Sequence, residues 1–407
     1  MSIPMKRTLF FTLCTLMLLS VLAVEASAIP AFARKYDMSC NTCHRPAPRL
    51  KAYGEEFAGN GFVLADKEAP RAYRDTGDDE LMLLREIPLA LRLEGYGSWK
   101  SGDAGKADMQ WPYLVKLLSG GQIAKDVSYY FYFFFGERGE VAGLEDAFVM
   151  FNKVFNSELD IYLGQFQVSD PLFKRELRMT LEDYQVYRVK PGLSSANLTY
   201  DRGVMLTYGF ATGTDITVEL LNGSGIGAAD ASRSFDSDKY KNTMFRLSQE
   251  LGEHFRVGGF AYFGREQGEN LDLAPSWRGV ATNDMWIAGP DVSVEFGNVQ
   301  VNAQYVARSD ENSFLYTPGW IAGTGPSKVK TNGAFGEVIF TPGGDAGKWY
   351  GAALYNWVDS EQNSLDYQTI TGHVGYMLAR NFRVVGEVTH DTIAKATKVS
   401  VGFVSAF

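Results

Sequence analysis

Cys40 and Cys43 are three positions apart, and His44 follows directly, in the run Cys40-Asn41-Thr42-Cys43-His44. Two thiols at this spacing can each add to one vinyl group of a porphyrin. A histidine directly after the second thiol is then placed to be the proximal ligand of the iron. On a helical turn the three side chains share one face. The spacing therefore predicts covalent attachment of one haem c through Cys40 and Cys43, with His44 as the proximal iron ligand.

A Cys-x-x-Cys pair also occurs as a small disulfide, as a thiol-exchange site or as half of a zinc site. A thiol-exchange pair is expected near a βαβ pattern, and a structural zinc site requires two further Cys or His ligands nearby. The sequence offers neither of these surroundings. The adjoining His44 is the feature that favours haem over the alternatives.

Residues 1–28 predict a secretory signal peptide. Two basic residues precede an apolar run from Leu9 to Val24, and Ala26-Ser27-Ala28 forms an A-x-A cleavage site. The run is shorter than the ~20 residues that a membrane-spanning helix needs. Cys14 lies within the run and would leave with the peptide. The mature chain would begin at Ile29 with a single Cys-x-x-Cys pair, which suits haem attachment in an oxidising compartment.

Residues 29–85 predict a small N-terminal haem-binding segment. A short helix is expected after the prolines that follow the cysteine pair, because Leu50, Tyr53 and Phe57 share one face. The glycines at 59 and 61 end it. A segment of this size cannot form a stable hydrophobic core without a cross-link or a bound cofactor, and haem would be that cofactor.

From residue 86 onward the chain keeps returning to an alternation of apolar and polar residues. In 299–308 the even positions are polar except Val306, and the odd positions are apolar: Val299, Val301, Ala303, Tyr305 and Ala307. Strands of about ten residues with one face for lipid and one for water are the signature of outer-membrane barrels. A β-sandwich or a propeller remains open for any single strand.

The connections between the expected strands alternate between short turns and long loops, as in bacterial barrels with periplasmic turns. Phe407 ends the last alternating strand, Pro290 interrupts another, and the connection 167–201 is long enough to hide a hairpin. The expected strands are 87–98, 111–119, 127–136, 144–153, 158–166, 202–211, 214–222, 241–250, 255–264, 283–296, 299–308, 333–341, 348–358, 367–378, 382–390 and 397–407.

The sequence therefore predicts an all-β fold, an outer-membrane antiparallel β-barrel of about 16 strands over residues 86–407. A lumen of that size holds more than side chains. The small helical monohaem cytochrome c segment would plug it, on the periplasmic side or inside the lumen. The expected location is the bacterial outer membrane, with lipid around the strands.

Three stretches carry a family resemblance. The segment from Pro30 to Arg34, the run Cys40–His44 and the stretch Tyr53–Phe62 resemble the N-terminus of the fused monohaem cytochrome-porins of outer membranes, best known from iron(II)-oxidising bacteria. The barrel also resembles the porins of the phosphate-selective O and P type, in Leu163–Phe166 and Asp201–Val204.

The first resemblance implies an electron path from an extracellular donor, Fe(II), through one haem to a periplasmic c-type cytochrome. The resemblance implies that Cys40 and Cys43 attach the haem and that His44 is the proximal iron ligand. It also implies an electron-transfer protein with an iron(II) oxidation activity. Two alternatives stay open. The same electron path can run outward, to extracellular metal or a partner cytochrome. The chain can also be an anion-selective porin with a haem-bearing plug, because the connection 167–201 carries five basic residues, Lys174, Arg175, Arg178, Arg188 and Lys190.

The second axial ligand of the iron is left open by the sequence. Met82 lies between the haem segment and the first strand, and ligation by Met would raise the reduction potential. Met38 is close in sequence but would have to fold back sharply. The alternation places His373 toward the lumen, where an ordinary polar wall residue is also expected. Met82 is our candidate for the distal ligand, although an ordinary apolar residue is expected there as well.

The formal net charge of -9 argues against nucleic acid as a partner. Patterns for a Ser-His-Asp triad, a phosphate loop or a dinucleotide site are not evident. Acidic residues in the expected outer loops would attract a cation such as Fe(II), although solvated loop charge explains them as well. They are Asp236, Asp238, Glu266, Glu269, Asp310, Glu311, Asp359 and Glu361.

Overall fold

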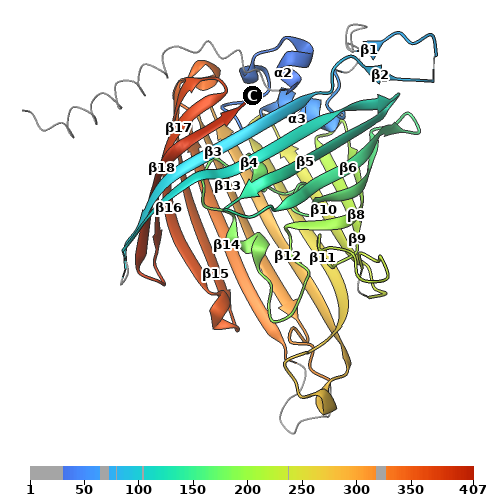
Figure 1. Cartoon of the computed structure of the whole chain (residues 1–407), viewed down its shortest axis with the longest axis vertical. Helices are drawn as coiled ribbons and strands as arrows, with labels where there is room; N and C mark the ends of the chain where they lie inside the picture. The colour runs from blue at the N-terminus through green and yellow to red at the C-terminus, as the bar shows by residue number, and fades with distance from the viewer. Residues whose placement is uncertain (1–30, 65–72, 79, 103–104, 237, 318–326) are drawn as a thin grey trace, which may run out of the picture.

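The computed structural model describes residues 31–64, 73–78, 80–102, 105–236, 238–317 and 327–407. The predicted signal peptide, 1–28, lies outside the described residues. Within the described ranges, strands β3 to β18 close into one antiparallel barrel of 16 strands (Figure 1). The last strand pairs with the first, so the barrel has no free edge. The predicted barrel of about 16 strands is confirmed, and a sandwich or a propeller is excluded.

Every range expected from the sequence overlaps one barrel strand. The strands are β3 (Leu89–Lys100), β4 (Lys106–Ala124), β5 (Val127–Glu137), β6 (Gly143–Val154), β7 (Leu159–Gln167), β8 (Tyr200–Gly209), β9 (Thr214–Leu221), β10 (Asn242–Leu251), β11 (Phe255–Glu269), β12 (Val280–Phe296), β13 (Val299–Asp310), β14 (Val329–Phe340), β15 (Trp349–Ser360), β16 (Tyr367–Ala379), β17 (Phe382–Asp391) and β18 (Ala396–Ala406). Pro290 interrupts the pairing of β12 with β13 without ending β12. Its missing N–H removes only one donor from the ladder.

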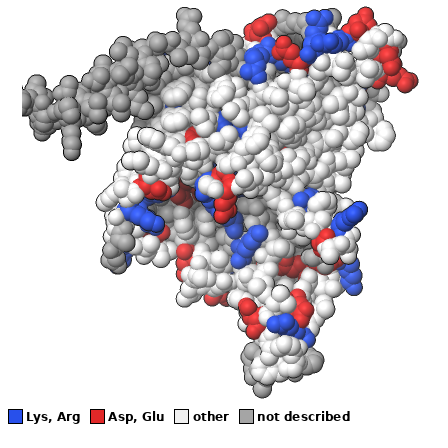
Figure 2. Space-filling model, viewed as in Figure 1, with Lys and Arg blue, Asp and Glu red and all other residues white. Residues whose placement is uncertain are grey.

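The alternation seen in the sequence separates an outer face from a lumen face. On β13, Val301 and Tyr305 are exposed on the outside, whereas Asn302 and Gln304 are buried inside. Figure 2 shows a broad uncharged band below a charged upper rim, with further charged residues lower on the molecule. An outer face with exposed apolar side chains and a lumen face with buried polar ones match a wall that stands in lipid.

Val374, near the middle of the outer face of β16, gives a test of this wall. The side chain is 52% exposed. We expect Val374→Arg to lower the free energy of unfolding in lipid vesicles by about 2–4 kcal/mol, because a cation at the bilayer midplane is poorly solvated. Chemical denaturation followed by tryptophan fluorescence measures this loss, and Val374→Leu is the matched control. A loss of stability that is equal in both variants would contradict a lipid-facing wall.

The N-terminal segment lies over the end of the barrel that carries the short turns (Figure 1). It contains α2 (Ala31–Tyr36), the 3-10 turn η1 (Cys40–Thr42) and α3 (Ala52–Gly59), and a small sheet of β1 (Tyr73–Arg74) and β2 (Leu83–Leu84) follows. We call residues 31–64 the cap. The expected helix is α3, but its predicted face is split, because Phe57 is buried while Tyr53 is 42% exposed. Among the described helices, none has the length and apolar character needed to cross a membrane.

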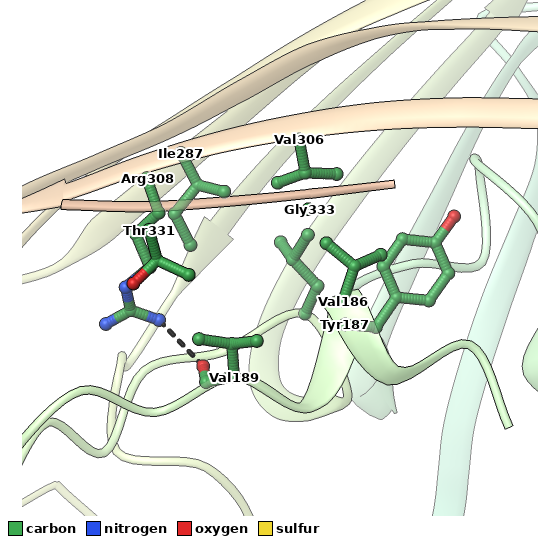
Figure 3. Close-up of a pocket in the computed structure, with 9 residues that line it drawn as sticks. Val186, Tyr187, Val189, Ile287, Val306, Arg308, Thr331 and Gly333 are labelled. Carbon is green, nitrogen blue, oxygen red and sulfur yellow. Dashed lines mark hydrogen bonds between the residues drawn. The ribbon is translucent and has the colours of Figure 1, made fainter. Parts of the chain in front are cut away.

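The long connection between β7 and β8, residues 168–199, folds into the barrel, and we call it the lumen loop. All of it is described, and it holds the 3-10 turns η3 (Arg175–Leu177) and η4 (Gln185–Arg188) in place of a hairpin. Val186 and Val189 point from this loop toward Ile287 and Val306 on the wall (Figure 3). The gap left between them is about 10 Å³, hardly room for one water molecule.

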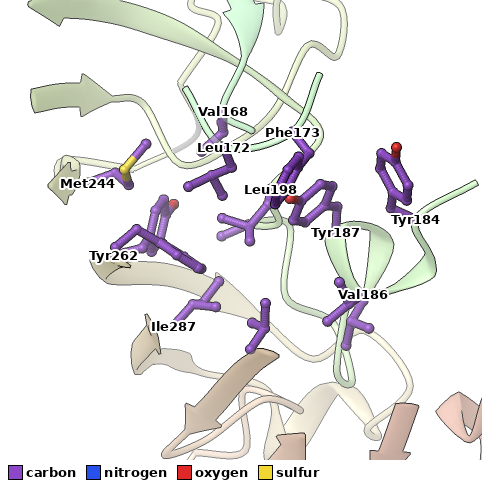
Figure 4. Close-up of a cluster of buried hydrophobic side chains, with 14 of the residues drawn as sticks. Val168, Leu172, Phe173, Tyr184, Val186, Tyr187, Leu198, Met244, Tyr262 and Ile287 are labelled. Carbon is purple, nitrogen blue, oxygen red and sulfur yellow. The ribbon is translucent and has the colours of Figure 1, made fainter. Parts of the chain in front are cut away.

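The hydrophobic core of the molecule lies in the lumen, where the loop meets the wall. Figure 4 shows side chains of the lumen loop converging with wall residues such as Met244, Tyr262 and Ile287. Tyr184 of the loop stacks on Phe335 of β14, with ring centroids 4.2 Å apart. The expectation that the lumen holds more than wall side chains is met, but what it holds at mid-height is this loop.

Candidate functional site

The cap is tied to one side of the barrel mouth by ion pairs. Arg45 and Arg49 both reach Glu295 at the end of β12, over 3.2 and 2.9 Å. Lys51 reaches Asp345, in the turn between β14 and β15, over 2.8 Å. These pairs are partly exposed, so each adds little free energy alone, but together they fix the part of the cap next to Cys43 and His44.

Apolar and backbone contacts hold the cap on the opposite side of the mouth. Phe62 stacks on Tyr130 of β5, with centroids 4.8 Å apart. Asn152 of β6 donates its amide to the carbonyl of Gly59 over 3.0 Å. Gly61 has φ +71 and lies against Ser128, so a side chain there would collide with the wall. The cap therefore reaches across the mouth from β12–β15 to β5–β6.

The backbone around the two cysteines forms one tight turn. The N–H groups of Cys43 and His44 both donate to the carbonyl of Cys40, over 3.3 and 3.0 Å. Helix α3 crosses directly above this turn, and Gly54 permits the approach, because a side chain there would run into the Cys43 carbonyl. The turn brings the three predicted haem residues together, as the sequence spacing requires.

The chemistry of these side chains fits a covalent haem. Cys40 and Cys43 are not joined in a disulfide. The Nδ1 atom of His44 lies 3.0 Å from the carbonyl oxygen of Pro48. When Nδ1 carries the proton it donates to this carbonyl, and Nε2 keeps a lone pair for iron. Burial lowers the pKa of the His44 imidazole, which favours the neutral form that binds metals.

The zinc alternative gains no support. In the ranges that the structure describes, no group of three or more His, Cys, Asp and Glu side chains could hold a metal ion.

The candidates for a second axial ligand lie in different places. Met82 precedes β2 in the small sheet, where the Tyr73 hydroxyl donates to Gln122 of β4 over 3.0 Å. His373 faces the lumen, as predicted, but Tyr350 lies 3.2 Å from its Nε2 and Glu387 lies 2.9 Å from its Nδ1. Both nitrogens of His373 are therefore engaged. Met82 as the distal ligand stays a prediction.

Four of the five basic residues of the lumen loop lie beside two carboxylates of the same loop. Arg175 forms an ion pair with Asp183, and Arg178 and Arg188 approach the same carboxylate within 3.8 and 3.9 Å. Lys174 pairs with Asp170 over 3.3 Å. Counting basic residues in the sequence therefore overstated the positive charge that this loop offers to an anion.

Wall residues on several strands bind the backbone of the lumen loop. Glu387 of β17 accepts the N–H groups of Leu181 and Glu182, over 2.6 and 3.0 Å. Arg308 of β13 donates to the carbonyl of Val189 over 3.0 Å (Figure 3). It also donates to the carbonyl of Ala196 over 2.8 Å. The sequence analysis did not single out these residues. A charged residue on the lumen face of a strand indicates that it has a partner, but the sequence does not show which residue that partner is.

A cavity of about 520 Å³ remains between the cap, the lumen loop and the wall. Leu50 and Phe62 line it from the cap, Phe173 from the loop and Tyr162 from β7. Its lining from the cap comes from residues 49–62 and includes none of the three predicted haem residues.

Three of the acidic residues expected to attract cations form internal contacts instead, and two of them, Glu266 and Asp310, lie in β11 and β13 and not in loops. Glu266 is 6% exposed and accepts from Ser195 and Asn283. Asp310 is fully buried and paired with Arg308 over 2.7 Å. Asp236 is paired with Lys241 in its own loop. These carboxylates are engaged in internal contacts.

Comparison with solved structures gives the class of the fold. The anion-selective porin from Comamonas acidovorans is 12% identical, with 79% of this chain and 99% of that chain covered and a TM-score of 0.53. The Salmonella typhi OmpF complex with daunomycin is 13% identical, covers 81% and 98%, and has a TM-score of 0.54. A loop L8 deletion mutant of OmpT, an outer-membrane protein of Vibrio cholerae, is 12% identical, covers 79% and 99%, and has a TM-score of 0.51.

The chain therefore has the 16-stranded fold of outer-membrane porins. No family model and no curated protein matches it. At such low identity the likeness concerns the fold alone.

Proposed function

We propose that this chain is an outer-membrane electron conduit. One haem c, bound covalently in the cap, would carry electrons from extracellular Fe(II) to a periplasmic c-type cytochrome. The observation that supports this most directly is the turn at 40–44, with two thiols free of a disulfide and an imidazole whose Nδ1 is held by a carbonyl. When bound, the haem supplies reversible one-electron transfer.

The residues of the cap have separate tasks in this proposal. Cys40 and Cys43 would hold the porphyrin through thioether bonds, so that the group is not lost by dissociation. His44 would offer Nε2 to the metal, with its ring oriented by the contact of Nδ1 with the Pro48 carbonyl. Outside the cap, Met82 is the proposed second ligand of the iron, which would raise the reduction potential.

The barrel insulates the two compartments and sets the direction of access. Its outer face would stand in outer-membrane lipid, and the short-turn end of such barrels is periplasmic. The cap then lies on the periplasmic side, where a soluble cytochrome can reach it. The lumen loop packs against the wall inside the lumen, where it would obstruct bulk solute, and this suits a conduit more than a diffusion pore.

Two alternative functions are open. One differs from this proposal in the direction of electron flow, and the other in whether the barrel conducts solutes. Outward electron transfer, to extracellular metal or a partner cytochrome, uses the same residues with the driving force reversed. An anion-selective porin with a haem-bearing plug is favoured by the fold shared with an anion-selective porin. The contacts of the loop arginines with Asp183 and the apolar core in the lumen weigh against that alternative.

The test uses the full chain, matured with c-type haem and placed in lipid vesicles with the cap inside, as shown by its protection from external protease. We expect Fe(II) added outside to reduce the haem, followed by its absorption spectrum. The His44→Ala variant should lose this reduction, and His390→Ala, an exposed histidine on β17, should keep it. Reduction only by a donor supplied on the cap side would favour the outward conduit, and a chain without covalent haem would rule out both.

A further inference from the structure

Arg383 is a buried cation without a carboxylate partner. It lies near the short-turn end of β17 and is only 8% exposed. Within the part of the chain that the structure describes, its guanidinium donates to the carbonyl of Ala47 in the cap and forms no ion pair, and its Nε has no partner. Because an unpaired buried charge is costly, a residue in this state indicates a missing anion.

Two further arginines face the same space. Arg92 of β3 and Arg178 of the lumen loop line, together with Arg383, a cavity of about 60 Å³. The Nε atoms of Arg92 and Arg178 are also buried without a partner. Three guanidinium donors thus approach one small cavity from three different segments, which is the arrangement that binds a carboxylate or another oxyanion.

The carboxylates around this cavity already have cationic partners, and Arg92 and Arg178 are two of these partners. Glu94 pairs with Arg92 over 2.5 Å and also accepts from the Tyr96 hydroxyl. Glu176 pairs with Lys116 of β4 over 2.5 Å. Asp183 is shared by three arginines of the lumen loop, Arg175, Arg178 and Arg188. The surroundings of the cavity therefore keep an excess of positive charge once every internal pair is formed.

The position of Arg383 indicates where an anion would come from. Its hydrogen bond to Ala47 joins the cavity to the cap three residues after His44. A haem bound through two thioethers carries two propionates at the opposite edge of the porphyrin, so their partners should lie away from Cys40 and Cys43. The geometry points to Arg383, with Arg92 and Arg178, as the binding site for a haem propionate. This assignment rests on the proposed haem attachment.

The reduction potential of the bound haem tests the assignment. Removing a positive charge near the propionate stabilises the oxidised iron, so Arg383→Gln should shift the equilibrium constant for reduction about tenfold, which lowers a one-electron potential by ~59 mV. Arg383→Lys keeps the charge and should restore most of the potential. The matched control is Arg138→Gln, because Arg138 lines the same cavity but is 52% exposed and donates to the Tyr113 hydroxyl.

A second experiment distinguishes a haem propionate from a free oxyanion as the anion bound at Arg383. It uses the Cys40→Ser/Cys43→Ser variant, which cannot attach haem. Phosphate should stabilise this chain against thermal unfolding, and Arg383→Gln should abolish that effect, whereas the haem-loaded chain should not respond to phosphate. Equal potentials in Arg383→Gln and Arg138→Gln, with phosphate stabilising the loaded chain as well, would overturn the assignment in favour of a free anion. Absence of covalent haem in the unmutated chain would instead contradict the proposed function itself.

Discussion

Replacing both Cys40 and Cys43 with serine should remove all covalently bound haem. A serine hydroxyl does not add to the porphyrin vinyl groups, and His44 alone would hold the group only by reversible ligation. We expect complete loss of haem staining after denaturing electrophoresis, against full staining of the unmutated chain. This is the largest effect expected from two side chains.

The barrel of the double serine variant should remain folded. Its closure depends on the pairing of β18 with β3 and on the lumen core, and neither involves the cysteine turn. Circular dichroism at the β-sheet band measures this. The matched control is His254→Ala, a change at an exposed histidine in the β10–β11 turn that should keep the stain. Covalent haem retained in the double serine variant would contradict attachment at this pair.

Removing the lumen loop should open the barrel to solutes. Gln167 pairs with Tyr200 across β7 and β8, so a two-residue Asn-Gly turn can replace residues 168–199 without disturbing either strand. A 16-stranded barrel without an internal plug has an aqueous channel, and we expect the conductance of single molecules in a planar bilayer to rise roughly tenfold or more.

The control for this deletion is Tyr187→Phe, which removes a hydroxyl bonded to Gln304 and leaves the apolar core in place. Its conductance should equal that of the unmutated chain. A conductance of the unmutated chain as high as that of the deletion variant would show that the loop does not obstruct the lumen. It would then favour the anion-selective porin over the electron conduit.

The sequence by itself determined the local features of this protein. Alternation in a strand places Val301 outside and Asn302 inside regardless of the neighbouring strands, because successive side chains point to opposite faces. The alternating stretches predicted about 16 strands, and the lengths of the connections predicted the end of the barrel where the short turns lie. The haem prediction is likewise local, since Cys40, Cys43 and His44 need only one turn of backbone to meet.

Only the tertiary structure decided what the lumen contains. The basic residues of the lumen loop suggested an anion path in the sequence, but in the folded loop Arg175, Arg178 and Arg188 share the carboxylate of Asp183, which reduces the positive charge open to an anion. The cap meets Glu295 and Arg383, which are hundreds of positions away in the chain. Such contacts depend on how the strands close and how the loop turns inward. Periodicity and spacing report which face a residue takes, whereas its partner across the barrel is set by the closure of the whole sheet.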